Sequence, residues 1–280
     1  MSAWQRVAAF LVVAGAVFAL ALGIGRATGP VDADAEEHAH GTHADDDQGS
    51  DVEEHGGDYV LELPRTAYRA GRQHLRFTVR GADGAPVTSY DVAHEKLLHL
   101  VVVRHDLARF RHVHPRLDPT SGSWSVPLDL EAGSWRIYAD FTPEGGTQTI
   151  AEADVSVAGE LVPRELPAAS DVARTDGYEV HLTREAGMLT FHLTRGHEPV
   201  TDLQTYLGAY GHLVAVRADD LAYVHVHPED GEAGPDIAFH STLEPGARYR
   251  LFLEFRHRGK VHRAELTTLA EEEHDDQHHH

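Results

Sequence analysis

One segment of the chain occurs twice, and this duplication constrains the fold more than any other feature of the sequence. Residues 84–115 read GAPVTSYDVAHEKLLHLVVVRHDLARFRHVHP, and residues 197–228 read HEPVTDLQTYLGAYGHLVAVRADDLAYVHVHP. The two segments align without a gap, so that both HVHP elements coincide. The similarity extends downstream, where EAGSWRIYADF at 131–141 resembles EPGARYRLFLEF at 244–255. The chain is therefore a tandem duplication of a unit of about one hundred residues.

Within each unit the residue pattern indicates β-structure. Short runs rich in Val, Leu, Tyr and Phe are separated by Gly, Pro and Asp, and YRLFLEF at 249–255 alternates with a period of two. We predict an all-β protein with two tandem immunoglobulin-like β-sandwich domains, at 58–158 and 178–269, joined by a linker at 159–177. A barrel is the alternative architecture. No stretch after residue 26 shows a helical period, so no helix is expected there.

The N-terminus is typical of a segment that directs export. Arg6 precedes an apolar stretch without charge at 7–25, so residues 1–26 are predicted to form a hydrophobic helix, either a cleaved signal peptide or a transmembrane anchor. Without cleavage, the positive flank keeps the N-terminus in the cytoplasm and the C-terminus outside. We therefore expect an extracytoplasmic protein, either secreted or held at the cell membrane by a single pass.

Two acidic, histidine-bearing segments flank the predicted domains, at 27–57 and 270–280. They contain too little apolar surface to offset the entropy cost of ordering, so both are predicted to be disordered. Their histidines and carboxylates would hold divalent ions weakly and raise the metal concentration near the folded domains. The formal net charge of −21 argues against a nucleic-acid partner, which requires a basic face.

The HVHP element of the first repeat predicts a metal site. Side chains two residues apart on a strand share a face, so His112 and His114 point the same way. The run LHLVVVR at 98–104 is the expected preceding strand, and a hairpin turning near residues 105–106 would set His99 opposite His112. Three imidazoles would then converge on one ion. The second repeat keeps the same spacing, which predicts a second site at His212, His225 and His227.

The sequence leaves the fourth ligand open between an oxygen, a further histidine and water. His94 and His240 have no histidine at the matching place of the other repeat, while Asp140 and Glu254 match each other. The two carboxylates are candidates for a ligand or for an acceptor of an imidazole N–H. Six further histidines have no matching partner and are interpreted as ordinary surface or strand residues: His74, His181, His192, His197, His257 and His262.

Residue types also narrow the metal and the chemistry. The chain has no cysteine and two methionines, so neither a thiolate site nor a thioether site for Cu(I) is expected. Neutral imidazoles suit Cu²⁺ and Zn²⁺, which are the predicted metals. Three histidines with water in the fourth position also describe a catalytic zinc. No Ser-His-Asp order, phosphate loop or H-E-x-x-H helix accompanies them, so no enzyme activity is expected.

The motif GxPV…HLVVVRxDLxxFxHVHP…AGxWRIYADF resembles bacterial extracytoplasmic β-sandwich proteins, namely the FixH/YtkA-like and CopC-like copper-associated modules, and uncharacterised actinobacterial secreted proteins that carry HVHP. The resemblance covers 58–158 and 178–269. It implies metal handling at the periplasm or cell surface, with copper or zinc. The chain departs from CopC-like proteins in lacking methionine-rich Cu(I) motifs, which argues against a Cu(I) carrier.

Two functional hypotheses follow from the sequence. The first is an extracytoplasmic, divalent-metal-binding protein with a three-histidine site in each repeat, for which a membrane-bound metal transporter is one candidate partner. The second is a cell-surface interaction module of two immunoglobulin-like domains, in which the histidines are structural or sense pH.

Overall fold

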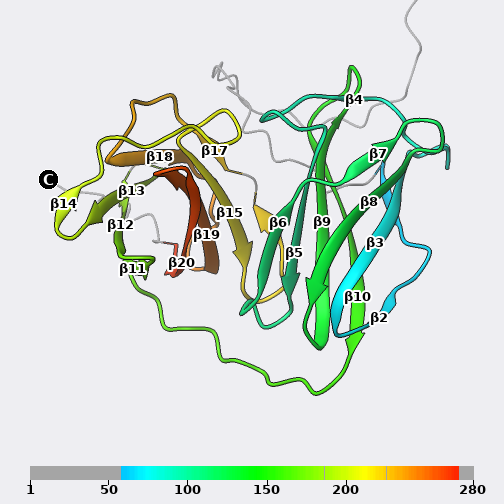
Figure 1. Ribbon diagram of the computed structural model, residues 1–280, viewed down its shortest axis with the longest axis horizontal. Coiled ribbons are helices and arrows are strands. Elements are labelled where there is room, and N and C mark those ends of the chain that lie inside the picture. The colour runs from blue at the N-terminus through cyan, green and yellow to red at the C-terminus, as the bar shows by residue number, and fades with distance from the viewer. Residues whose placement is uncertain (1–57, 186, 225, 271–280) are drawn as a thin grey trace, which may run out of the picture. The chain divides into compact units, whose positions relative to one another are not determined.

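The computed structural model describes residues 58–185, 187–224 and 226–270. Within the last range, the backbone of His227 is described but its side chain is not. The predicted N-terminal helix and both acidic segments, except residue 270, lie outside the described residues. The described chain contains strands and no helix, as expected (Figure 1). No helix long and apolar enough to cross a membrane occurs among the described residues.

The first repeat forms two sheets. One has the strand order β1-β3-β8-β7 and the other β2-β10-β9-β5-β6, with β4 paired to β9. The strands are β1 (Val60–Glu62), β2 (Ala67–Arg69), β3 (Gly71–Arg80), β4 (Tyr90–Asp91), β5 (Leu98–Arg104), β6 (Phe110–Val113), β7 (Arg116–Asp118), β8 (Ser123–Leu130), β9 (Gly133–Pro143) and β10 (Thr149–Ala158). The chain changes sheet between β6 and β7, so His114 and Pro115 lie where it crosses from one sheet to the other.

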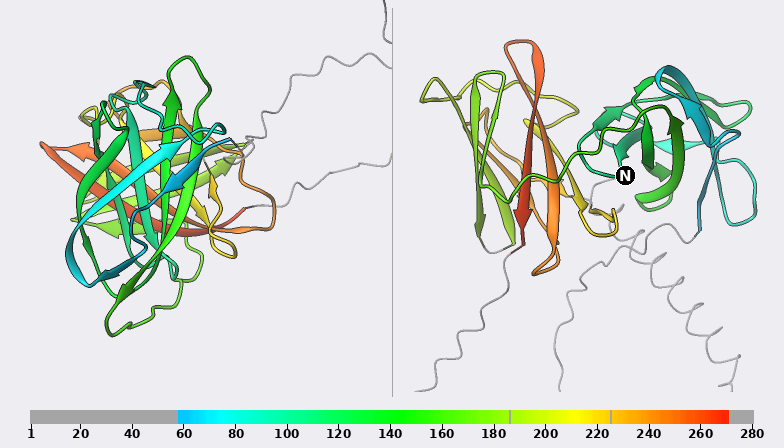
Figure 2. Two further views of the ribbon diagram at one scale, coloured as in Figure 1. Left: turned by 90° about the vertical axis from the view of Figure 1, so that its right-hand side faces the viewer. Right: turned by 90° about the horizontal axis from the view of Figure 1, so that it is seen from below.

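The second repeat follows the same plan. Its sheets have the orders β11-β12-β13-β18-β17, with β14 paired to β13, and β16-β15-β19-β20. The strands are β11 (Val172–Thr175), β12 (Tyr178–Glu185), β13 (Met188–Arg195), β14 (Glu198–Pro199), β15 (Gly211–Arg217), β16 (Tyr223–Val224), β17 (His227–Pro228), β18 (Asp236–His240), β19 (Arg248–His257) and β20 (Lys260–Leu269). Figure 2 shows the hairpins β12–β13 and β19–β20 as two layers.

Each repeat has its own hydrophobic core between its two sheets. In the first, Phe77 and Trp124 on one sheet face Trp135 on the other, and alternate residues of β5 join them. In the second, Phe191 of β13 packs in one cluster with Phe255 of β19. Alternating residues of each strand thus bury one face, as a sandwich requires. The all-β sandwich prediction is confirmed at this level, and the closer immunoglobulin-type topology stays a prediction.

The outer face of β5 is buried as well, since every residue from Leu98 to Arg104 is buried. Val101 and Val103 belong to a third apolar cluster, which also contains Val214 and Val216 of β15. This cluster joins the two repeats through the outer faces of equivalent strands. A continuous apolar run such as LHLVVVR is the pattern of a strand buried on both sides.

The contacts between the repeats come in matched pairs. Phe110 of β6 stacks on Phe252 of β19, with ring centroids 4.1 Å apart. The repeat equivalents of these two residues are Tyr223 and Tyr138, and their rings also lie in contact, at 5.1 Å. The Tyr138 hydroxyl donates a hydrogen bond to the Leu221 carbonyl of the second repeat. Each repeat therefore offers the same surface to the other.

Candidate metal centre

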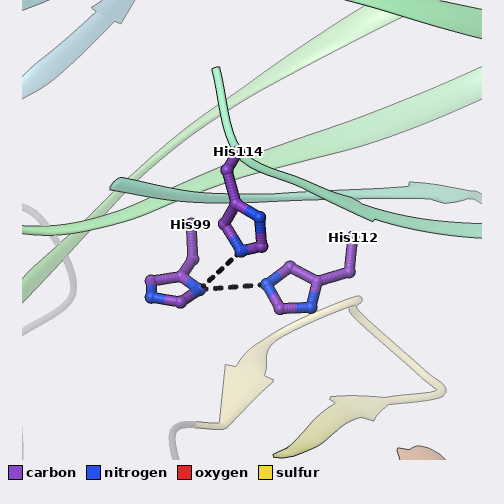
Figure 3. Close-up of side chains that lie close together, drawn as sticks. All are labelled: His99, His112 and His114. Atoms are coloured by element: carbon purple, nitrogen blue, oxygen red, sulfur yellow. Dashed lines mark hydrogen bonds between the residues drawn. The ribbon is translucent and has the colours of Figure 1, made fainter. Parts of the chain in front are cut away.

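Three histidines of the first repeat converge beside the apolar cluster that joins the two repeats (Figure 3). His99 Nδ1 lies 3.1 Å from His112 Nε2 and 3.3 Å from His114 Nε2. One nitrogen from each ring lies within 4.8 Å of the other two. For a tetrahedral ion bound at 2.0–2.1 Å, two ligand nitrogens are separated by roughly 3.4 Å, so the two measured separations fit joint coordination.

The β-structure places these side chains by parity. Even-numbered residues of β5 face the core of the first sandwich, so His99 faces outward with Val101. In the β5–β6 hairpin, Val101 pairs with His112 and Leu100 with Val113. The expected pairing of His99 with His112 is therefore wrong by two residues, because the turn is longer than assumed and closes between Arg104 and Arg109. A shift of two residues preserves the face, so the cluster forms despite the different register.

Two of the rings are held through their outer nitrogens. His99 Nε2 donates to the Ala93 carbonyl at 3.1 Å, and His112 Nδ1 donates to Glu254 Oε2 at 2.9 Å. A carbonyl and a carboxylate can only accept, so these nitrogens carry the protons of the neutral rings. When both rings are neutral, His99 Nδ1 and His112 Nε2 therefore face each other with lone pairs. This is the tautomer that metal-binding histidines adopt when an acceptor fixes the far nitrogen.

A proton or a metal ion can bridge two facing lone pairs. His114 can donate an Nε2 proton to His99 Nδ1, but that atom still faces the lone pair of His112 at 3.1 Å. Polar nitrogens that remain unpaired in a buried place cost free energy. A divalent ion bound by all three nitrogens would remove this cost.

Burial keeps His99 and His114 in the neutral form that binds metal. His99 is 4% exposed, and the side chain of His112 is fully buried. Burial, reinforced by neighbouring His112, lowers the pKa of His99 to about 4. Burial and the charges of His112 and His99 lower the pKa of His114 to about 3. Both rings are neutral at pH 7, so an incoming ion would displace no proton from them.

The second repeat contributes directly to the surroundings of this cluster. Glu254, which holds His112, lies on β19 and is 7% exposed. The ring of His212, on β15, stacks on His112 with centroids 4.8 Å apart and on His99 at 5.3 Å. His94 completes the group, 5.6 Å from His212. The candidate centre thus lies where the two repeats meet, which the sequence did not indicate.

The predicted second site is only partly visible. His212 lies against the first cluster, while His225 and the side chain of His227 lie outside the described residues. The backbone of His227 pairs with His240 in the sheet opposite to that of His212. The grouping of His212, His225 and His227 therefore stays a prediction.

The candidates for a fourth ligand occupy different positions. The repeat alignment suggested Glu254 as an acceptor for an imidazole N–H. Glu254 does accept such a hydrogen bond, but the donor is His112 of the first repeat and not a histidine of the second. Asp140 pairs with His99 in the β5–β9 ladder and accepts a hydrogen bond from Gln148 at 2.8 Å. Exposed His240 lies on β18. Among the described residues, His94 and His212 are the nearest additional imidazoles.

Two histidines interpreted as ordinary surface or strand residues are in fact buried in polar networks. His257, 3% exposed, bridges the Tyr178 hydroxyl at 2.7 Å and Asp202 at 2.8 Å. His262, 7% exposed, contacts Asp176 at 2.8 Å. Their carboxylate partners, Asp202 and Asp176, are distant in sequence, so the residues around each histidine did not indicate that it is buried.

Comparison with known proteins gives one family. A family model described as a domain of unknown function, DUF8832, matches residues 35–159 and 173–272, which is more than half of the chain. The chain belongs to the DUF8832 family. No curated protein matches this DUF8832 protein.

Several solved structures show weak similarity to the DUF8832 protein. A Salmonella alpha-2-macroglobulin mutant is 14% identical with a TM-score of 0.25, and E. coli alpha-2-macroglobulin is 15% identical with a TM-score of 0.25. Each match covers 76% of this chain, and this chain spans only 14% of either macroglobulin. The fibronectin(III)-like modules of Clostridium thermocellum CbhA are 9% identical, with coverage of 79% and 98% and a TM-score of 0.21.

Proposed function

We propose that this protein binds a divalent metal ion, Cu²⁺ or Zn²⁺, through His99, His112 and His114, and that it handles this metal outside the cytoplasm. The observation that supports the proposal is the orientation of the rings. The outer nitrogens of His99 and His112 are occupied by acceptors, and their inner nitrogens face each other at 3.1 Å. Neutral imidazole suits both metals, and the chain lacks cysteine.

The proposed role is binding and transfer of the metal, not catalysis. With His99 only 4% exposed and the side chain of His112 fully buried, little of the centre is open to a substrate. A catalytic zinc keeps an open position for water and substrate. The extracytoplasmic location rests on the apolar segment 7–25, and a membrane-bound transporter is the proposed partner for metal exchange.

The test is the number of tightly bound ions per chain. Metal-free full-length protein is titrated with Zn²⁺ and Cu²⁺ in the presence of a competing chelator, which removes ions held weakly by the terminal histidines. We expect His112→Ala to lose one tight equivalent. The control is His74→Ala, because His74 is an exposed histidine on β3 of the same repeat.

Equal numbers of tight ions in the His112→Ala and His74→Ala proteins would refute the proposal. A second tight ion that disappears with His227→Ala would support the predicted site in the second repeat. Under the alternative function, an interaction module with pH-sensing histidines, neither metal would raise the melting temperature of the wild-type protein.

A further inference from the structure

A cavity lined by arginines lies between the two repeats, and no histidine is among its lining residues. Its volume is about 280 Å³, and its walls come from the start of β6, the inter-repeat linker, β19 and β20. Five arginines line it: Arg109, Arg111, Arg164, Arg250 and Arg263. Segments far apart in the sequence therefore bring their positive charges to one place.

The charge balance of this cavity is opposite to that of the chain. The five arginines face two lining carboxylates, Glu165 and Glu265, which leaves a formal excess of three positive charges. Glu131, which pairs with Arg109 at 2.5 Å, reduces the excess to two when it is included. The chain as a whole carries a formal charge of −21. Such a concentration of positive charge in an acidic protein favours an anionic ligand.

Carboxylates of the protein do not satisfy all of these arginines. Glu265 is shared between Arg250 at 2.8 Å and Arg263 at 3.1 Å. Arg250 is 7% exposed, and its Nε has no hydrogen-bond partner among the described residues. Among the described residues, no carboxylate forms a salt bridge with Arg111 or Arg164. Burial and the neighbouring Arg263 lower the pKa of Arg111, while Glu131 and Asp129 act in the opposite direction.

Aromatic rings hold two of the guanidinium groups in place. Arg263 lies over the ring of Phe110 at 5.1 Å, and Arg250 lies 5.7 Å from the ring of Phe252. Phe110 and Phe252 are the stacked pair that joins the repeats. Glu265 occupies part of the N–H edge of both guanidinium groups, but their fixed positions mean that part of the ordering cost of binding an oxyanion is already met.

We propose that this cavity binds a small multivalent oxyanion, either a di- or tricarboxylate or a phosphate. Two parallel N–H groups of a guanidinium match the paired oxygens of a carboxylate or of a phosphate. A multivalent ligand matches the excess of positive charge, and the volume lies just below the range of drug-sized pockets, so the ligand is small. The site uses none of the metal-binding residues, and its occupancy is independent of the metal.

The test is calorimetric titration of the metal-free full-length protein at constant ionic strength, with citrate, inorganic phosphate and acetate as probes. We expect saturable binding of citrate or phosphate, and binding of acetate at least tenfold weaker. The tighter of the two multivalent probes identifies the carboxylate or the phosphate as the preferred group. Chelator is removed before titration, since a polycarboxylate chelator would compete for the cavity.

Two variants locate the binding. Arg111→Gln removes a half-buried cavity charge, and Arg164→Gln removes an exposed one on the linker, where folding is not at risk. Each is expected to raise the dissociation constant about tenfold, the scale of one lost charge-assisted pair. Arg76→Gln, on the exposed side of β3, is the matched control. Absence of saturable binding by all three probes, or equal weakening by Arg164→Gln and Arg76→Gln, would overturn the proposal.

Discussion

Glu254 is the residue through which the second repeat acts on a proposed metal ligand of the first, and its replacement gives the sharpest prediction. Glu254→Gln retains the size of the side chain and removes the negative charge that accepts the Nδ1 proton of His112 at 2.9 Å. The His112 side chain is fully buried and that of Glu254 is 10% exposed, so solvent screens the charge of Glu254 only weakly.

Replacement of the outer hydrogen-bond partner of a metal-binding histidine typically costs about 10–100-fold in metal affinity. This corresponds to about 1.4–2.8 kcal/mol. Because the amide oxygen of Gln can still accept the Nδ1 proton of His112 and only the negative charge is lost, we expect a value near the lower end of this range. The affinity is measured by competition with a chelator of known strength, on the full-length protein.

The control is Glu179→Gln, because Glu179 also contacts a histidine, His181, at 2.6 Å but at a more exposed position of the second repeat. Its metal affinity should equal that of the wild type. A second comparison uses the His112→Ala background, in which Glu254→Gln should change the affinity no further. If Glu254→Gln leaves the dissociation constant unchanged, or weakens binding equally without His112, the role assigned to Glu254 is refuted.

Two further predictions concern stability. Phe252→Ala removes a fully buried ring from the cluster between the repeats and should lower the free energy of unfolding by about 3–5 kcal/mol, whereas Val92→Ala at a 68% exposed position should change it little in the same urea titration. The metal-free protein should lose stability as the pH falls from about 6.5, where the unfolded histidines take up protons, towards about 4, where the folded His99 does so. Each of His99 and His114 contributes at most about 1.4 kcal/mol per pH unit to the slope of the unfolding free energy against pH. This slope, measured by urea unfolding between pH 7 and pH 4.5, should be smaller in His114→Ala. An equal slope in the variant and the wild type would contradict the assignment.

The sequence predicted the parts of the fold that depend on local pattern and on duplication. Alternation and turn residues gave the strands, and the shared parity of His99, His112 and His114 brought them to one face. Parity is robust because a register shift of two residues preserves it, and the hairpin shows such a shift.

The remaining features depend on how the two repeats meet, for which the sequence carries only a weak signal. The unbroken apolar run of β5 indicated burial on both faces, but it did not identify the second repeat as the covering surface. For this reason the contact of Glu254 with His112 and the position of His212 were not foreseen. The arginine cavity combines four separate segments of the chain, so no sequence motif could have indicated it.

The reciprocal contacts of Phe110 with Phe252 and of Tyr138 with Tyr223 also bear on the history of the chain. A single ancestral unit with this surface would have been self-complementary, and two copies would have assembled as a symmetric homodimer. Fusion of the two genes made that association intramolecular, so it no longer depended on concentration. Each half could then change independently, so Glu254 could come to differ from its counterpart Asp140 while the contact between the two halves was kept.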